Sequence, residues 1–96
     1  MPDYSAHYAE TDRLMRELLG QTESLLSLSE AAEVHELLEA REYGLALESL
    51  ASILVDARKT VDKDVVRRVD DLAASMRLDS ADFVKSFDSY ARTHAH

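Results

Sequence analysis

The chain has 96 residues and no cysteine, so we expect one small domain without disulfides or thiolate chemistry. Its formal net charge of −8 argues against nucleic acid or an anionic membrane as a direct ligand, because both repel an acidic surface. With 46% hydrophobic residues, two glycines and one proline, the composition favours a folded helical protein over a disordered or β-rich chain.

The N-terminal segment is polar and acidic, unlike a secretory signal or an arginine-rich transit peptide. No apolar run approaches the roughly 18 residues that a membrane span needs. The lack of cysteine agrees with a reducing compartment. We therefore predict a cytoplasmic protein. A basic protein partner fits the negative charge, although an acidic surface also serves solubility alone.

The first predicted helix runs from about Asp3 to Leu19, with Asp3 as its N-cap and Gly20 as its C-terminal stop. Apolar and aromatic residues recur along it at helical spacing. The next segment, residues 21–28, is either a short helix or a connection packed against the core. Its leucines favour burial, whereas its serines and threonine compete with a helix for backbone hydrogen bonds.

A capping-box pattern, Ser27 with Glu30, precedes a second helix over about Glu30 to Arg41. A tight corner at Glu42-Tyr43-Gly44 leads into a third helix, which ends near Asp56. That helix is apolar around most of its circumference and leaves only Glu48, Ser49, Ser52 and Asp56 for water. So narrow a polar stripe predicts a central helix that other helices cover on several sides.

The fourth predicted helix covers about Lys63 to Arg77 and has Asp62 as its N-cap. A last helix, capped by Asp79, runs to about Ala91, and the tail 92–96 is expected to fray. Every periodic segment is helical. We predict an all-α fold: one domain over residues 1–96, a compact bundle of four to five short, mostly antiparallel helices.

The sequence contains neither a glycine-rich phosphate loop nor a nucleophile elbow. His35 to Glu39 is superficially similar to the zinc-protease pattern His-Glu-x-x-His, but Glu39 stands in place of the second histidine ligand. Several carboxylates lie close together in the sequence, but helical periodicity places them on faces exposed to solvent. Their pKa values are not expected to be pushed apart there, as acid–base catalysis requires. We predict no catalytic residue, no metal site and no cofactor.

The second helix has an acidic side formed by Glu33, Glu36 and Glu39, and Tyr43 is expected to project near its end. Tyrosine is a favoured interface anchor, and dispersed negative charge speeds association with a basic partner. Asp70 and Asp71 on the fourth helix are further candidates. The alternative is a solvated helix face with Tyr43 packed at the corner.

Three sequence segments carry a resemblance to a known family. They are Val34-His35-Glu36-Leu37-Leu38 followed by Glu42-Tyr43-Gly44-Leu45-Ala46-Leu47-Glu48-Ser49-Leu50, and then Leu72-Ala73-Ala74-Ser75-Met76-Arg77-Leu78-Asp79. In order and spacing, this chain resembles the MafI family of small bacterial immunity proteins over about Val34 to Asp79. The resemblance implies a cytosolic antitoxin that protects against a toxin delivered by sibling bacteria. Such toxins are commonly nucleases, carried as the C-terminal domain of a larger secreted protein.

The resemblance marks the core of the fold and supplies no binding residues. The resulting hypothesis is one-to-one occlusion of a basic toxin domain by the acidic helix side, with Asp70 and Asp71 as additional contacts. The competing hypothesis is a small cytosolic helical adaptor or regulator that acts through an apolar surface, either as a weak homodimer or as a protein-interaction module. Its candidate residues are Leu25, Leu26 and Leu28, and the stripe of Phe83, Phe87 and Tyr90.

Overall fold

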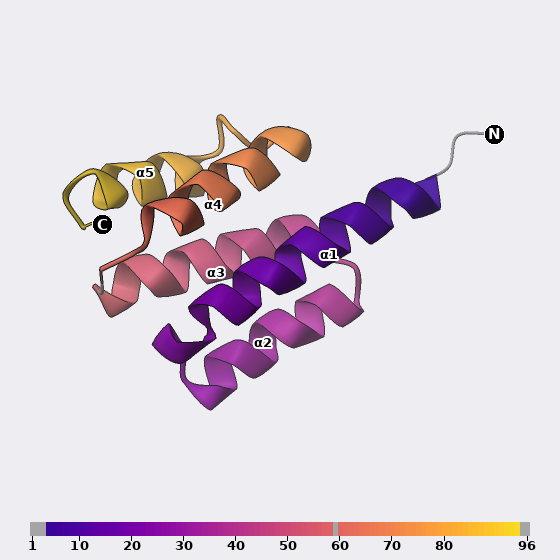
Figure 1. The fold of residues 1–96 in the computed structure, drawn as a ribbon, viewed down its shortest axis with the longest axis horizontal. Coiled ribbons are helices and arrows are strands. Elements are labelled where there is room, and N and C mark those ends of the chain that lie inside the picture. Colours follow the sequence, from indigo (N-terminus) through magenta and orange to yellow (C-terminus); the bar gives the residue numbers. More distant parts are fainter. Residues whose placement is uncertain (1–3, 59, 95–96) are drawn as a thin grey trace.

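The computed structural model describes residues 4–58 and 60–94, with side chains from Tyr8 onward. Its elements are α1 (Tyr4–Thr22), a 3₁₀ turn η1 (Glu23–Leu25), α2 (Leu28–Glu39), α3 (Tyr43–Ala57), α4 (Lys63–Ser75) and α5 (Asp82–His94). Consecutive helices run in opposite directions (Figure 1). The predicted all-α bundle is confirmed, with five helices in the part of the chain that the structure describes.

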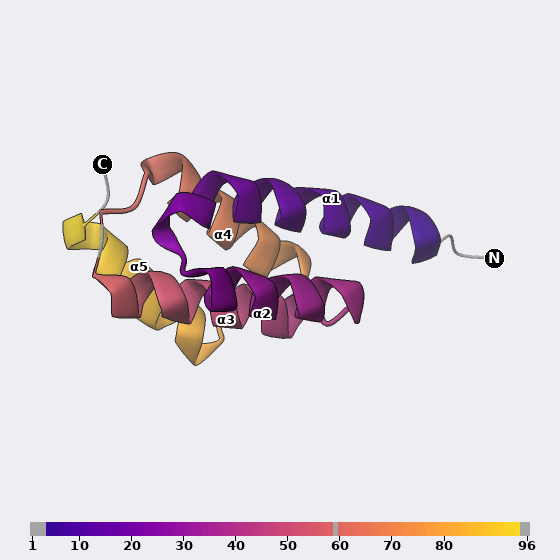
Figure 2. The same ribbon diagram turned by 90° about the horizontal axis from the view of Figure 1, so that it is seen from below.

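The helices form two layers, which are seen most clearly edge-on in Figure 2. One layer has α3 in its middle, with α2 along one side of it and α5 along the other. The second layer consists of α1 and α4, which pack against each other and against α3. One side of the three-helix layer is therefore covered by α1 and α4, and its other side faces solvent.

The predicted central role of α3 is confirmed, because α3 contacts each of the other four helices. Its residues Leu47, Leu50 and Leu54 are fully buried. The largest side chains packed around them come from different helices: Met15 and Leu18 of α1, Leu38 of α2, Val69 of α4 and Phe87 of α5. Each such side chain contributes about 1.5–3 kcal/mol on burial, which makes this cluster the main source of stability.

Two helix starts follow local side-chain chemistry that the sequence predicts. The Ser27 hydroxyl accepts a hydrogen bond from the Glu30 amide at 3.1 Å, and the Glu30 carboxylate accepts one from the Ser27 amide at 2.8 Å. This capping box satisfies amides that would otherwise lack partners at the start of α2. At the start of α4, the Asp62 carboxylate accepts a hydrogen bond from the Asp64 amide at 2.7 Å.

Three helices end at an arginine in the left-handed backbone conformation: Arg41, Arg58 and Arg77, with φ of 59°, 51° and 60°. At the end of α2, the Arg41 amide donates to the Leu38 carbonyl and the Glu42 amide to the Leu37 carbonyl. This is the Schellman arrangement, and α4 ends in the same way at Arg77. Because the chain turns at residues 40–42, Tyr43 and Gly44 belong to α3 and not to the corner.

The prediction that Gly20 ends α1 is wrong, because the helix continues to Thr22. Gly20 lacks a positive φ, and the buried Thr22 hydroxyl donates to the carbonyls of Leu18 and Leu19 at 2.9 and 3.2 Å. These bonds satisfy Thr22 inside the last helical turn. The predicted N-cap Asp3 lies outside the described residues.

The predicted start of the last helix is also displaced. Asp79 lies in the turn after α4, and α5 begins at Asp82. The helix extends to His94, so residues 92–94 of the expected frayed tail are helical, whereas residues 95–96 lie outside the described part. The Val61 amide donates to the His94 carbonyl at 2.9 Å and so ties the end of α5 to the start of α4. Among the described helices, none is long and apolar enough to cross a membrane.

Candidate protein-interaction surface

Negative charge is concentrated in two adjacent helices of the three-helix layer. α2 and α3 carry six carboxylates and no lysine or arginine: Glu30, Glu33, Glu36, Glu39, Glu48 and Asp56. Helices α1, α4 and α5 each mix acidic residues with lysine or arginine. Most of the formal net charge of −8 therefore belongs to α2 and α3. We use the term acidic surface for the exposed side chains of Glu33, Glu36, Glu39 and Glu48.

The three predicted glutamates of α2 are all exposed, but their surroundings differ. Glu39 lies 3.3 Å from Arg16 of α1, which also pairs with Asp12 at 2.8 Å. Within the described chain, Glu33 and Glu36 have no cationic partner. Consequently Glu39 is partly neutralised and ties α2 to α1, while Glu33 and Glu36 present unpaired charge to solvent.

Tyr43 does not lie at the end of this acidic side. Its side chain is only 8% exposed, and its hydroxyl donates to the Asp12 carboxylate of α1 at 3.2 Å. Its ring also stacks on that of Tyr8, with 6.2 Å between ring centroids. Burial, followed by the charge of Asp12, raises the pKa of Tyr43 above its ordinary value. Tyr43 thus packs α1 against α3, and it is not available as an exposed anchor.

Asp70 and Asp71 do not extend the acidic surface either, because α4 lies in the other layer (Figure 2). Asp71 is exposed and lies 3.9 Å from Arg67 of the same helix. Asp70 is half-buried, and one of its carboxylate oxygens is inaccessible to solvent. Of the six predicted contact residues, only the three glutamates of α2 belong to the acidic surface. Tyr43 is packed against α1, and Asp70 and Asp71 lie on α4 in the other layer.

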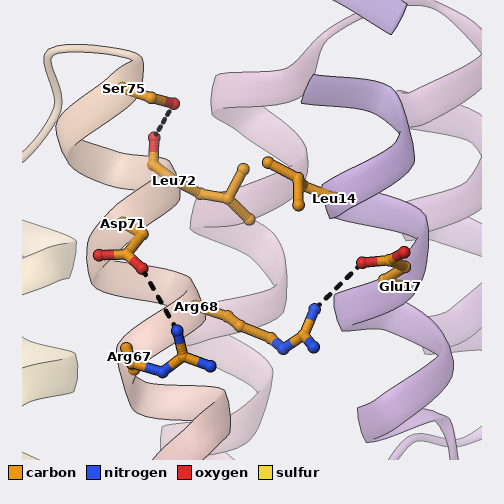
Figure 3. A pocket seen from close by; sticks show the side chains of 7 residues that line it. All are labelled: Leu14, Glu17, Arg67, Arg68, Asp71, Leu72 and Ser75. Atoms are coloured by element: carbon orange, nitrogen blue, oxygen red, sulfur yellow. Dashed lines mark hydrogen bonds and ion pairs between the residues drawn. The ribbon is translucent and has the colours of Figure 1, made fainter. Parts of the chain in front are cut away.

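Asp71 lines a shallow depression between α1 and α4, shown in Figure 3. Across it, Arg68 of α4 pairs with Glu17 of α1 at 3.2 Å and with Asp64 at 2.9 Å. Arg67 and Arg68 together hold the pKa of Asp64 well below its usual range. The charged groups in this depression form ion pairs with one another. This is the arrangement of a contact between two helices, here α1 and α4.

Leu45 is 51% exposed, although the apolar pattern of α3 predicts that it is covered. The other leucines of α3 are fully buried. A sequence signal for this exposure exists: Leu45 lies three, four and seven residues before Glu48, Ser49 and Ser52, so all four share one side of the helix. The solvent side of α3 therefore combines the predicted polar stripe with one large apolar side chain.

Comparisons of the chain with protein-family models, with curated proteins and with solved structures found no match.

Proposed function

We propose that this chain is an immunity protein that binds the C-terminal domain of a cognate toxin and neutralises it by occlusion. The toxin domain is a basic nuclease, the complex is one-to-one, and the contact is made through the acidic surface of α2 and α3. The chain itself catalyses nothing, needs no cofactor, and acts in the cytoplasm, where it meets the incoming toxin. The resemblance of residues 34–79 to the MafI family supports this reading.

The observation that carries the proposal is the concentration of unpaired carboxylates on one side of the bundle. A nuclease presents lysine and arginine to the phosphates of its substrate, so its cleft attracts a surface of the opposite charge. Glu33 and Glu36 are exposed, and no described cation neutralises them. Such a surface accelerates association with a basic protein and repels nucleic acid itself.

The acidic surface is also held in place before any partner binds. A capping box fixes the start of α2, a Schellman arrangement fixes its end, and the Arg16–Glu39 pair ties it to α1. A preorganised helix loses little conformational entropy on binding, which favours tight complexes with small rearrangements. These features suit an inhibitor that occupies a cleft in stoichiometric amounts.

A helical adaptor that forms a homodimer is the second candidate, and one observation favours it. Leu28 is 92% exposed at the first position of α2. The other residues considered for an apolar dimer surface are taken up by the fold: Phe87 is fully buried, and Leu25, Leu26, Phe83 and Tyr90 are partly buried against the core. Light scattering separates the two candidates, because a dimer that persists at high salt supports the adaptor and a monomer supports the inhibitor.

The proposal is tested by affinity capture of the tagged chain from its host and, in parallel, by co-expression with the neighbouring gene. The captured partner is then assayed for cleavage of plasmid DNA and of RNA while the purified chain is titrated in. We expect a basic partner whose nuclease activity falls to zero at one equivalent of the chain. Recovery of only the chain itself, from both host and co-expression, would replace the inhibitor with the adaptor.

Charge reversal locates the contact. Glu36→Lys should weaken the complex at least about tenfold, whereas Asp71→Lys, with the same charge change in the other layer, should leave its affinity unchanged. Both positions are exposed, so the melting temperatures of the two variants should stay close to that of the wild type. Equal losses from both substitutions would show a general effect of net charge, and the acidic surface would then not be the contact.

A further inference from the structure

Leu45 stands at the boundary of two adjoining depressions on the solvent side of the three-helix layer. One depression lies between α2 and α3 and includes Glu33, Ser49 and Ile53. The other lies between the start of α3 and the α4–α5 turn and includes Leu78 and Phe83. Leu45 and Glu48 line both, so the two depressions adjoin at these side chains, and we use the term groove for the two depressions together.

The apolar part of this groove is larger than Leu45 alone. Ile53 of α3, Leu78 of the turn after α4 and Phe83 of α5 are all partly exposed. They line the same two depressions as the half-exposed Leu45, which is the large hydrophobic residue of α3 that the core leaves most accessible. An apolar patch framed by polar side chains is typical of a contact site, whereas single exposed leucines occur on any protein surface.

All charged side chains that line the groove are negative. Glu33, Glu42, Glu48 and Asp82 line the two depressions, and neither depression has a lysine or arginine among its described lining residues. None of these four carboxylates forms an ion pair with a described residue. The groove therefore combines an apolar patch with carboxylates on both sides of it, and no described lysine or arginine lines it to neutralise them.

We infer that this groove binds an amphipathic basic segment of the partner. An apolar side chain of that segment seats between Leu45 and Phe83, and flanking lysines or arginines meet Glu33, Glu48 and Asp82. The inference rests on the proposed function for the identity of the partner, and it moves the centre of the contact from α2 to the junction of α2, α3 and α5. An apolar anchor supplies affinity here, and the carboxylates select and orient the partner.

The charges argue against the other occupants of an exposed apolar groove. Two copies of this chain pairing through it would bring Glu48 and Glu33 of both copies into a shared, partly desolvated interface. Like charges at such an interface repel each other and weaken it. An anionic lipid surface would meet the same repulsion. A basic amphipathic polypeptide can bury an apolar side chain against the apolar patch and pair its cations with the surrounding carboxylates.

The test uses a synthetic amphipathic helix of leucine and lysine as the probe. A peptide with the same composition in scrambled order and a leucine–glutamate peptide serve as controls for charge and for apolar character. Binding is measured by titration calorimetry, and the contact is mapped by NMR from the methyl groups of the leucines. We expect the amphipathic basic peptide alone to bind, with shifts at Leu45 and Leu78 and none at Leu28.

The chain offers a matched pair of variants. Leu45→Ser should weaken binding of the basic peptide at least about tenfold, whereas Leu28→Ser should leave it unchanged, although Leu28 is the more exposed leucine. Glu48→Lys, a second variant in the same groove, should weaken binding to a similar extent. Circular dichroism confirms that the variants remain folded, which is expected because both leucines project into solvent.

The inference is overturned if the scrambled peptide binds as tightly, if Leu28→Ser matches Leu45→Ser, or if sedimentation shows a dimer that Leu45→Ser abolishes. Its failure is separable from that of the proposed function. A captured toxin that binds Leu45→Ser at full affinity removes the groove and leaves the immunity function. Selective peptide binding without any toxin partner leaves the groove and removes the immunity function.

Discussion

Asp70 of α4 and Asp88 of α5 face each other, and each keeps one carboxylate oxygen buried without a hydrogen-bond partner in the described part of the molecule. Burial, and then the neighbouring Asp88 carboxyl, raises the pKa of Asp70 from 3.8 to about 6. An ionised Asp70 is repelled by the carboxyl of Asp88, which favours the protonated form of Asp70. We therefore expect the contact between α4 and α5 to depend on pH.

The sign of this dependence follows from the direction of the shift. The folded chain holds the proton of Asp70 more tightly than the unfolded chain, because its folded pKa is the higher of the two. The stabilisation from this proton is complete below about pH 4 and is lost as the pH rises through about 6.

Asp70→Asn should therefore raise the free energy of unfolding at pH 7, because it removes the repulsion and adds amide donors. We expect about 1 kcal/mol, less than the full pKa shift would give, since the half-buried pair is partly screened by water. Near pH 4 the advantage should vanish. Urea denaturation at both pH values measures it. Glu36→Gln, an equal charge change at an exposed position of α2 far from this pair, is the control and should not show this gain in stability.

Arg77 adopts the left-handed conformation that ends α4, where a residue with a Cβ atom is strained. Arg77→Gly should stabilise the protein by about 0.5–1 kcal/mol, because glycine adopts this conformation without that cost. The same substitution inside α4, Arg67→Gly, should destabilise it by about 1 kcal/mol. Thermal unfolding of the two variants measures both effects, and a loss of stability in Arg77→Gly would show that its side chain matters more than its backbone.

Gly20 lies in the last turn of α1, and a Cβ atom built there meets nothing within 4 Å. Gly20→Ala should raise the free energy of unfolding by about 0.5–1 kcal/mol, the usual difference between these residues in a helix. At Gly44 a Cβ atom would lie 3.4 Å from Leu78 Cδ1, so the gain from Gly44→Ala should be smaller. Chemical denaturation distinguishes them. Equal gains at both sites would mean that the Leu78 contact relaxes freely.

The hydroxyl of Tyr43 binds Asp12, and its ring packs between α1 and α3. Tyr43→Phe should reduce stability by about 0.5–1.5 kcal/mol, the usual net value of one hydrogen bond, and should leave partner binding unchanged. Urea denaturation and the nuclease-inhibition assay read out the two properties separately. If Tyr43→Phe weakened inhibition while the stability held, Tyr43 would be a contact residue after all.

Local chemistry in the sequence determined the start of α2 and much of the helical register. Ser27 and Glu30 lie close enough along the chain to form a capping box, and the Asp62 side chain lies close enough to accept the Asp64 amide as the N-cap of α4. Helical periodicity likewise identified α3 as the central helix. Such signals are readable because the interacting groups lie within one helical turn of each other.

Only the tertiary structure decided which sides of the helices remain exposed. The outward position of Leu45, the packing of Tyr43 against Asp12 and the meeting of Asp70 with Asp88 all depend on the two-layer arrangement. Residues 31 positions apart, such as Tyr43 and Asp12, meet through long-range packing that local propensity does not encode. The sequence by itself thus determined the acidic, all-helical character of this protein. The packing of α1 and α4 on one side of α3 decided where its candidate contact surface lies.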